Sequence, residues 1–267
     1  MKTGAINWGN PVARCGLNDG LAGWWLARGP WVGGGTWFDL CGKNNGTLTN
    51  GPTWGRSARL GNTGHVVFDG TDDRVAIGRT GIAFGSNYTI SLWVYGNSGF
   101  GTASTQVFAA PRATANNYPF VLHQTSSTSK FRFTTNAGSD VNFNYNFSPT
   151  NGVWYFLTAV KDSTTTNLYL NGELDNSGTQ AVGTDNADNI ALGSHNFGSG
   201  FNHFLNGRLD SFRVYPGRSL SDSEVRCLYN DEISGYPLTL NRLSRRAGYV
   251  AAATGNRRRR LLIAGTR

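Results

Sequence analysis

The chain has 267 residues, 36 glycines, 12% aromatic and 15% charged residues, and a formal net charge of +8. Abundant glycine and aromatic residues with few charges are typical of short strands joined by tight turns and exclude a mainly helical protein. The sequence has no apolar run of about 18 residues and no apolar segment of a secretory signal near its start. We therefore predict an all-β protein that is made in a reducing cytoplasm and does not span a membrane.

The charge is divided unevenly along the chain. Residues 1–235 carry equal numbers of basic and acidic side chains, whereas residues 236–267 carry eight arginines and no acid. The excess of positive charge therefore belongs entirely to the C-terminal segment. We predict three parts: an extended N-terminal arm at residues 1–20, a β-sandwich domain at residues 21–234 and a basic tail at residues 235–267.

Three cysteines are present, Cys15, Cys41 and Cys227, and no two of them form a CxxC motif. An odd and low number predicts neither a disulfide framework nor a zinc site. We expect buried free thiols, because unpaired cysteine is among the most buried residue types.

Short apolar or alternating runs follow one another along the first half of the chain, with turn residues between them. Their recurrence at intervals of roughly 8–15 residues favours a sandwich or a barrel. The predicted strands in this half are Gly23–Leu26, Val66–Phe68, Asp73–Ile77, Tyr88–Tyr95, Gln106–Ala109, Phe120–His123, Lys130–Thr134 and Val141–Phe147.

The stretch Val153–Asp175 is the centre of the predicted sheet. Residues 153–160 are almost all apolar at odd and even positions alike, as expected of a strand that is buried on both faces. The polar run Asp162–Asn167 then turns the chain, and Leu168–Leu170 begins the next strand. Asn171–Gly172 predicts a type I′ hairpin turn, because this turn requires positive φ at both central residues.

Ile190–Gly193 and Gly207–Tyr215 are the last predicted strands, and a helix follows them. Ser221 and Glu224 have the spacing of a capping box, in which each side chain accepts a hydrogen bond from the other residue's backbone N–H. This helix should pack on the sandwich and end no later than Pro237. Its predicted apolar face holds Val225, Leu228 and Tyr229.

Several short motifs occur in an order that is specific for one fold family. They are Gly23-Trp24-Trp25, Asp39–Trp54, Phe68–Asp73, Tyr88–Val94, Trp154-Tyr155, Leu168–Gly172 and Leu209–Tyr215. In this order they resemble the laminin-G-like branch of the concanavalin A-like lectins and glucanases, over roughly residues 21–232. The resemblance implies that residues 21–234 form a jelly roll of two antiparallel sheets, one concave and one convex, with one short C-terminal helix.

The two ends of the chain carry a second resemblance. The opening INWGNP…GLAGWW and the arginine-rich ending look like those of laminin-G-like proteins that tailed phages encode. This resemblance implies a structural protein of the virion that is made in the host cytoplasm.

Catalysis by paired glutamates is one function to test. Glucanases of this fold use two glutamates that flank an aspartate on one strand, because retaining hydrolysis needs carboxyl groups about 5 Å apart. This chain has only Glu173, Glu224 and Glu232, and none has another carboxylate at strand spacing except across a turn. The four histidines lack metal-ligand spacing, and no Gly-x-Ser-x-Gly elbow precedes a helix. We therefore predict a protein that is not an enzyme.

The resemblance also implies one structural calcium ion as the sole cofactor. Ca²⁺ prefers carboxylate, amide and backbone oxygens that are held by tight turns. In relatives such an ion lies between the turn after the first strand and the aspartate of the closing strand. The matching residues are Asp39, Asn44 and Asp210. The alternative is that Asp39 caps its own turn and that Asp210 accepts hydrogen bonds from backbone amides.

A sugar-binding groove is the third candidate site. Sugars stack on aromatic faces, while amides and other polar groups bind their hydroxyls. Asn142, Asn144 and Tyr145 line the polar side of a predicted strand, and the loops supply further aromatic and amide groups. The alternative is that the two loop phenylalanines plug one end of the sandwich. The predicted loop residues are Tyr118, His195, Asn196, Phe197, Phe201, Asn202 and His203.

The basic tail is the last candidate. It has no aromatic residue interleaved with its arginine run on which bases could stack, which argues against nucleic acid as a partner. We expect the arginines to contact an acidic neighbour and the apolar residues after them to enter an interface, the alternative being a solvated tail. The predicted contact residues are Arg245, Arg246, Arg257, Arg258, Arg259, Arg260, Leu261 and Leu262.

These features predict a non-catalytic, lectin-like structural protein of a larger assembly, such as a decoration or tail component of a phage virion. Its expected partners are other virion subunits, copies of itself and glycans, but no membrane. The alternative function is that of an adhesin for glycans on a host surface. A glycoside hydrolase is the third hypothesis, which the scarcity of glutamate disfavours.

Overall fold

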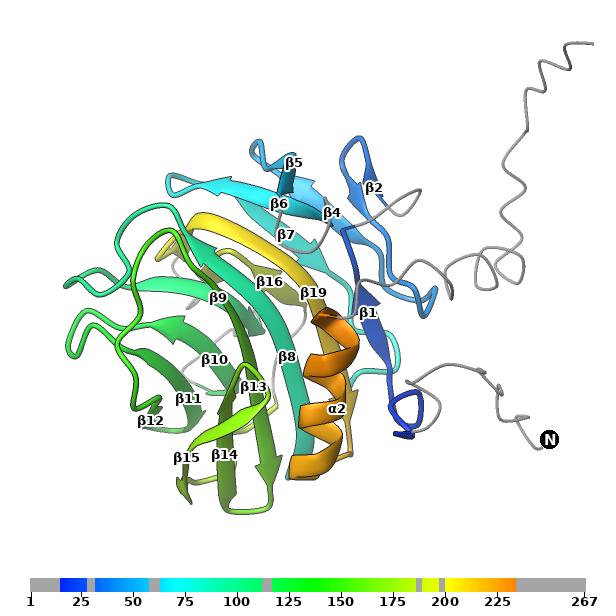
Figure 1. The fold of residues 1–267 in the computed structure, drawn as a ribbon, viewed down its shortest axis with the longest axis vertical. Helices are drawn as coiled ribbons and strands as arrows, with labels where there is room; N and C mark the ends of the chain where they lie inside the picture. Colours follow the sequence, from blue (N-terminus) through cyan, green and yellow to red (C-terminus); the bar gives the residue numbers. More distant parts are fainter. Residues whose placement is uncertain are drawn as a thin grey trace, which may run out of the picture. The chain divides into compact units, whose positions relative to one another are not determined.

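Two large antiparallel sheets form the body of the computed structural model, which describes residues 15–27, 32–57, 63–111, 117–185, 189–196 and 200–233 (Figure 1). The first sheet has the order β15 (Glu173–Thr179), β14 (Thr165–Leu170), β13 (Trp154–Asp162), β8 (Asn87–Gly96), β19 (Asn206–Pro216), β6 (Thr63–Asp69) and β5 (Thr53–Ser57). β1 (Gly23–Trp25) also pairs with β19, beside this row of strands.

The second sheet faces the first across the core. A separate hairpin is formed by β17 (His195–Asn196) and β18 (Phe201–Asn202). The predicted all-β jelly-roll sandwich with one helix after its last strand is confirmed. The second sheet has the order β12 (Asp140–Asn144), β11 (Phe131–Ala137), β10 (Asn117–Gln124), β9 (Gln106–Pro111), β16 (Ile190–Leu192), β7 (Arg74–Ile77), β4 (Gly46–Thr49), β3 (Thr36–Trp37) and β2 (Val32–Gly33).

The strand β13 is buried on both faces, as its sequence predicts. Leu157 and Ala159 point between the two sheets and belong to the main core. Phe156 and Val160 point the other way and pack in a second apolar cluster that includes residues of the C-terminal helix. Because each face of β13 meets an apolar layer, its charged residues, Lys161 and Asp162, stand at its end, and Thr158 is the one polar residue within it.

The turns on either side of β14 differ in how well the sequence predicted them. Asn171 and Gly172 have φ values of 51° and 82°, which confirms the type I′ turn. The preceding turn is shorter than the polar run suggested, because β14 already begins at Thr165 and pairs its polar residues with β13. The strand therefore begins three residues before Leu168, where the sequence predicted its start, because the polar residues 165–167 pair with strands on both sides.

The helix α2 (Asp222–Ile233) lies along the outer side of the first sheet (Figure 1). The capping box is confirmed: the N–H of Ser221 donates to Glu224 Oε2 at 2.8 Å, and the N–H of Glu224 faces Ser221 Oγ at 3.4 Å. Val225 and Leu228 are fully buried on the predicted apolar face. No helix among the described residues is long and apolar enough to cross a membrane.

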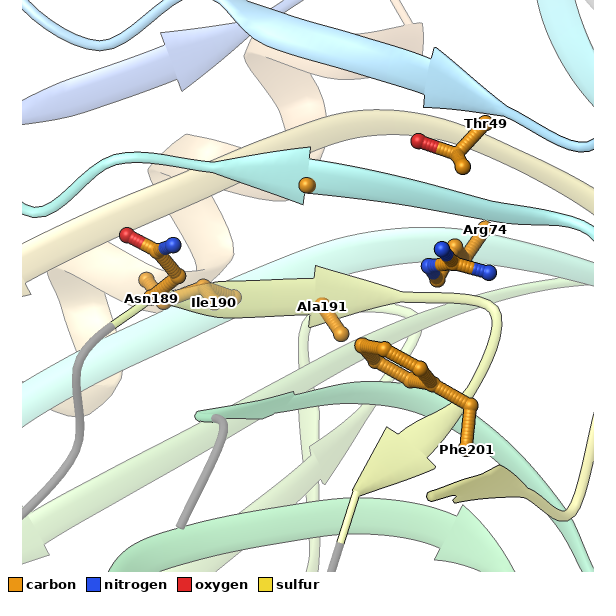
Figure 2. A pocket seen from close by; sticks show the side chains of 7 residues that line it. Thr49, Arg74, Asn189, Ile190, Ala191 and Phe201 are labelled. Carbon is orange, nitrogen blue, oxygen red and sulfur yellow. The ribbon is translucent and has the colours of Figure 1, made fainter. Parts of the chain in front are cut away.

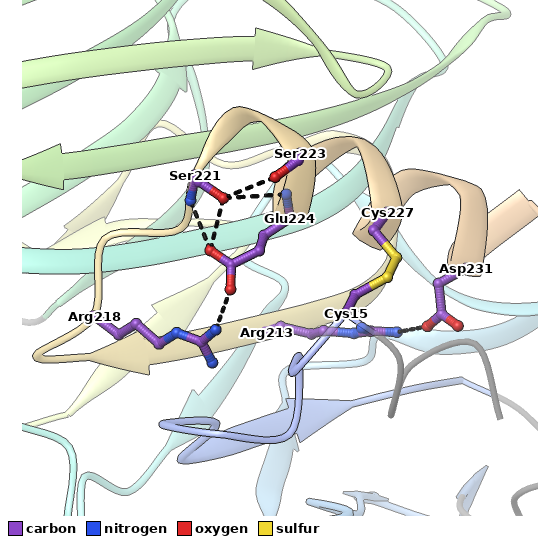
Figure 3. Close-up of a disulfide and its surroundings, with 8 residues drawn as sticks. All are labelled: Cys15, Arg213, Arg218, Ser221, Ser223, Glu224, Cys227 and Asp231. Carbon is purple, nitrogen blue, oxygen red and sulfur yellow. Dashed lines mark hydrogen bonds and ion pairs between the residues drawn. A yellow bond between two sulfur atoms is a disulfide. The ribbon is translucent and has the colours of Figure 1, made fainter. Parts of the chain in front are cut away.

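A disulfide joins Cys15 to Cys227 on α2, over a sequence separation of 212 (Figure 3). The prediction of free thiols is therefore wrong for these two residues, because the fold brings the start of the described chain against the helix. Leu17 is fully buried in the same apolar cluster, and the segment Cys15–Gly20, part of the predicted extended arm, is folded into turns. Cys41 is a free thiol, and burial beside Asp39 raises its pKa to about 12.

Candidate functional site

The outer face of the second sheet carries the candidate site. Strand alternation points Val75 and Ile77 of β7 into the core and turns Arg74 and Ala76 outward. The registers place Ala76 beside Ala191 of β16. Small side chains at adjoining positions leave a shallow hollow above the sheet.

A pocket of about 180 Å³ occupies this hollow (Figure 2). Pockets that enclose a drug-sized ligand measure roughly 300–1,000 Å³, so this one has room for a single ring rather than a long chain. Its floor is methyl groups, its rim is polar, and one aromatic ring stands at its side. The lining residues are Thr49, Arg74, Ala76, Asn189, Ile190, Ala191 and Phe201.

Arg74 and Phe201 form one side of the pocket. The guanidinium carbon of Arg74 lies 4.2 Å from the centre of the Phe201 ring, within the range of a cation–π contact. The two residues come from β7 and β18, which are far apart in the sequence and meet because the hairpin β17–β18 folds over the sheet. This contact fixes the guanidinium at the edge of the pocket.

The hairpin also covers apolar residues on the outer face of β9 and β10. His195 is fully buried and meets the Tyr118 ring edge-on, with 5.4 Å between the ring centres. Tyr118 donates its hydroxyl proton to Asp140. Burial lowers the pKa values of His195 and His123 to about 3, so both imidazoles are neutral at physiological pH. The contact between His195 and Tyr118 fixes the hairpin in place, and neither of these two buried side chains is open to a ligand.

Beyond the hairpin, polar side chains run across β10, β11 and β12. His123 Nε2 lies 3.0 Å from Thr134 Oγ1, which donates to Asn142 Oδ1 at 2.8 Å. Arg132 Nε donates to Asn144 Oδ1 at 2.6 Å. The expectation that Tyr145 lines this face is wrong, because β12 ends at Asn144 and the tyrosine turns into the core, where it is fully buried.

The structure divides the predicted sugar-binding residues into separate places. Phe201 lines the pocket, whereas His195 and Asn196 of the hairpin, and Tyr118 in contact with His195, are buried. Asn202 pairs with His195 across the hairpin and is half-buried, and His203 is exposed with a φ of 55°. Phe197 lies outside the described residues, as do all of the predicted assembly contacts in the basic tail.

The residues that matter for the pocket but were not predicted are Thr49, Arg74, Ala76, Asn189 and Ala191. Alanine has no chemical signature of binding, and an arginine on an alternating strand reads as an ordinary exposed residue. Only the register, which sets Thr49 beside Arg74 and Ala76 beside Ala191, brings them together. The one sequence signal available was a small residue, Ala76 or Ala191, at an outward position in each of two predicted strands.

The predicted calcium residues make extensive contacts with the backbone. Asp39 Oδ1 accepts hydrogen bonds from the N–H groups of Trp24 and Cys41, and its Oδ2 accepts those of Lys43 and Asn44. Four N–H donors match the roughly four lone-pair sites of a carboxylate. Asp39 therefore fits the role of a turn cap, with each carboxylate oxygen accepting two backbone N–H groups.

The other two calcium residues are used similarly. Asn44 exchanges two hydrogen bonds with the backbone of Thr80, at 2.7 and 3.0 Å. Asp210 Oδ1 accepts from the N–H groups of Ala27 and Ser211. These contacts correspond to the capping alternative, and calcium binding stays a prediction.

Another set of acids lies at the turn between β6 and β7. Asp69, Asp72 and Asp73 place one oxygen each within 4.8 Å of one another. Burial, together with the charges of the other two carboxylates, raises the pKa of Asp73, while the N–H of Asp69 donates to it at 2.9 Å. Asp73 therefore contributes to the geometry of the turn through a hydrogen bond, as does Asp69, whose Oδ1 accepts the N–H of Thr71 at 2.7 Å.

The three glutamates each hold parts of the fold together. Glu173 pairs with Arg226, and Glu224 caps the helix and pairs with Arg218. Glu232 lies inside α2 and is 1% exposed. It is the centre of a buried group that we call the Arg213 cluster, made up of Trp24, Trp93, Ser211, Arg213, Asp231 and Glu232.

The model of the concanavalin A-like lectin/glucanases superfamily, Laminin_G_3, matches residues 69–226. The chain belongs to this superfamily. The match includes β7, β16 and most of the segment that forms the pocket, and it agrees with the two-sheet architecture. A search among curated proteins found no match.

Solved structures with the same fold include domain 4 of AbnA, a GH43 extracellular arabinanase from Geobacillus stearothermophilus, in complex with arabinotriose. It is 22% identical, with a TM-score of 0.56, covering 69% of this chain and 87% of that chain. The binding domain of Paraclostridial Mosquitocidal Protein 1 is 18% identical, with a TM-score of 0.62, covering 81% and 53%. The binding domain of Botulinum Neurotoxin DC, in complex with SialylT, is 16% identical, with a TM-score of 0.61, covering 80% and 52%.

The chain therefore spans most of the arabinanase domain but only about half the length of the two toxin binding domains. At these identities the similarity shows a shared fold and no more. Each of the three structures is named as a binding domain or contains a bound carbohydrate.

Proposed function

We propose that this protein is a non-catalytic, lectin-like module that binds a carbohydrate in the pocket beside Phe201. The observation that carries the proposal is the make-up of that pocket: a methyl floor, an aromatic side, and polar groups at the rim. A sugar ring presents C–H groups on its faces and hydroxyl groups at its edge, so it needs both kinds of surface at once.

The position of the pocket supports the proposal. Ala76 and Ala191 let a ring approach the sheet closely, while Thr49 and Asn189 stand at the rim, where hydroxyls would lie. A pocket of about 180 Å³ that is open to solvent suits one residue of a longer glycan. The matched superfamily and the fold shared with carbohydrate-bound domains favour the same function.

A binding role is favoured over hydrolysis by the use of the glutamates. Glu232 and Asp231 both contact Arg213 in the interior, and their side chains are at most 1% exposed. Glu173 and Glu224 are engaged at the surface with arginines and the helix start. Among the described residues, the pocket lining has no carboxylic acid that could protonate a glycosidic oxygen.

A glycan array followed by calorimetric titration of the hits tests the proposal. Ala76→Phe places a ring on the pocket floor and should abolish binding, while Phe201→Ala should weaken it by removing the aromatic side. Val153→Ala, at the residue before β13 of the first sheet and 43% exposed, is the matched control and should bind as the parent does. An array without hits, or hits that Ala76→Phe leaves unchanged, would refute a sugar site here.

Attachment to a larger assembly, such as a phage particle, is a second proposed role. It is supported by the division of charge, since all of the net positive charge resides in residues 236–267. Detecting the chain by mass spectrometry in purified particles, and losing it from them after replacement of Arg257–Arg260 by glutamine, would support this role. A chain that is absent from any particle would contradict it.

A further inference from the structure

The pocket contains a single charged residue. Its seven lining residues include Arg74 and no acid. Arg79, Arg213, Arg218 and Arg226 all pair with carboxylates in the described part of the chain, whereas Arg74 forms no ion pair with a described residue. Among the described residues, the guanidinium of Arg74 instead stacks on the ring of Phe201. A fixed positive charge at the edge of a pocket lacks an anion to balance it.

The way in which Arg74 is held leaves its hydrogen-bond donors usable. A guanidinium that stacks on a ring uses its flat face, while its N–H groups point outward in the plane. Arg74 is half-buried, and none of its nitrogens is among the buried atoms without a partner, so they reach solvent. Two parallel N–H groups match the two oxygens of a carboxylate.

Nearby acids do not neutralise this charge. Asp72 and Asp73 precede Arg74 in the chain, but alternation turns Asp73 to the other side of the strand, where it is 3% exposed and accepts the N–H of Asp69. None of the three aspartates of this turn lines the pocket. The groups that do share the pocket rim with Arg74, Thr49 and Asn189, are neutral.

We propose that the pocket selects acidic sugars, with the carboxylate of a uronic or sialic acid residue bound by Arg74. The sugar ring would lie over Ala76 and Ala191, and its hydroxyls would reach Thr49 and Asn189. This inference rests on the proposed function and specifies the class of glycan that the same pocket takes. The planar, two-oxygen carboxylate is the group that the fork of a guanidinium binds with the best geometry.

The test compares each acidic sugar with its own methyl ester, which keeps the ring and removes the charge. The probes are trigalacturonate and 3′-sialyllactose, titrated into the full chain beside their esters and beside neutral arabinotriose. At least one acid should bind about tenfold more tightly than its ester, the difference expected of one charge-assisted contact. Arg74→Gln should remove this preference, and Arg74→Lys should retain part of it, because the charge remains but the fork is lost.

Arg56→Gln is the control variant, since Arg56 is an exposed arginine on the first sheet and the change in net charge is the same. It should leave the preference for the acid intact. Equal affinity for acid and ester, or a preference that survives Arg74→Gln, overturns this inference while leaving sugar binding in place. If none of the probes and no member of the glycan array binds, the proposed function fails and this inference fails with it.

Discussion

The Arg213 cluster offers the sharpest test of what holds the fold together. Arg213 Nη2 donates to Glu232 Oε1 at 2.5 Å and to Asp231 Oδ2 at 3.3 Å, and all three side chains are at most 1% exposed. The guanidinium also stacks on Trp24 at 3.9 Å. The cluster therefore joins α2 to β19 and β1 through charges that are sealed from water.

Removing one charged partner leaves the others buried without compensation. Arg213→Met leaves the carboxylates of Asp231 and Glu232 buried without a positive partner, and it should lower the free energy of unfolding by about 3–5 kcal/mol. Glu232→Gln keeps one acceptor for Ser211 and Arg213, but it sets an N–H₂ group against the indole N–H of Trp93, which now donates to Glu232 Oε2 at 3.1 Å. The loss of the charge and of that hydrogen bond should cost about 3 kcal/mol.

The double variant distinguishes a coupled cluster from independent contacts. Without Arg213, the charge of Glu232 destabilises the fold, so removing that charge as well costs less. The double variant should therefore lose at least about 1 kcal/mol less free energy of unfolding than the sum of the two single losses. Urea unfolding at pH 7, with the slope against denaturant checked for constancy, measures all three. Arg226→Met is the comparison: its partner is Glu173, and both side chains are more than half exposed (57% and 68%), so its effect should be far smaller.

Additive effects of the two substitutions, or single losses no larger than that of Arg226→Met, would refute the reasoning. Either result would mean that water reaches the cluster or that the helix rests on apolar contacts alone.

Three further predictions concern other parts of the fold. Replacing Cys15 and Cys227 by serine should lower the free energy of unfolding by about 2–5 kcal/mol, because the bond closes a long loop; urea unfolding with and without reductant measures it. Gly172→Ala should destabilise by more than about 1 kcal/mol, because φ is 82° and the new Cβ would lie 2.7 Å from Tyr229 Cβ. His195 has its folded pKa lowered to about 3, so the unfolded chain binds more protons and stability should fall as pH drops below about 6.5, with His195 alone contributing about 2 kcal/mol between pH 7 and 5.

Each of these three has its own control. If reductant destabilises the parent and leaves the serine variant unchanged, the bond is present; equal behaviour of both would contradict it. Gly34→Ala has positive φ but an empty surrounding, so it should cost less than Gly172→Ala. His195→Gln should flatten part of the dependence of melting temperature on pH, and an unchanged slope would show that His195 is not the source.

The sequence predicted those elements whose signals are local. Asn171–Gly172 specified its turn because only small or amide residues tolerate positive φ at both positions. The apolar faces of β13 and of α2 followed from periodicity alone, since burial acts on every residue of a face. The capping box could be predicted because its two partners, Ser221 and Glu224, are only three residues apart in the sequence.

What the sequence could not predict depends on contacts between distant segments. Cys15 and Cys227 carry no spacing signal, and only the packing of the first turns against α2 brings them together. The loop aromatics were predicted to be open to ligand, but β17 pairs with β18 and folds over β9, which buries His195 and leaves Phe201 at the pocket. Arg74 became a candidate only once the registers of β4, β7 and β16 were known.

The disulfide has a mechanical consequence. It connects residues near the two ends of the described chain, at a sequence separation of 212, and so closes nearly the whole sandwich into a covalent ring. A stretching force applied between the segments before Cys15 and after Cys227 would be carried by the S–S bond and would not load the hydrogen bonds of the sheets. Tethered at both ends, the sandwich could then bear tension without being unravelled, and a nick in one of its loops would leave the pieces joined.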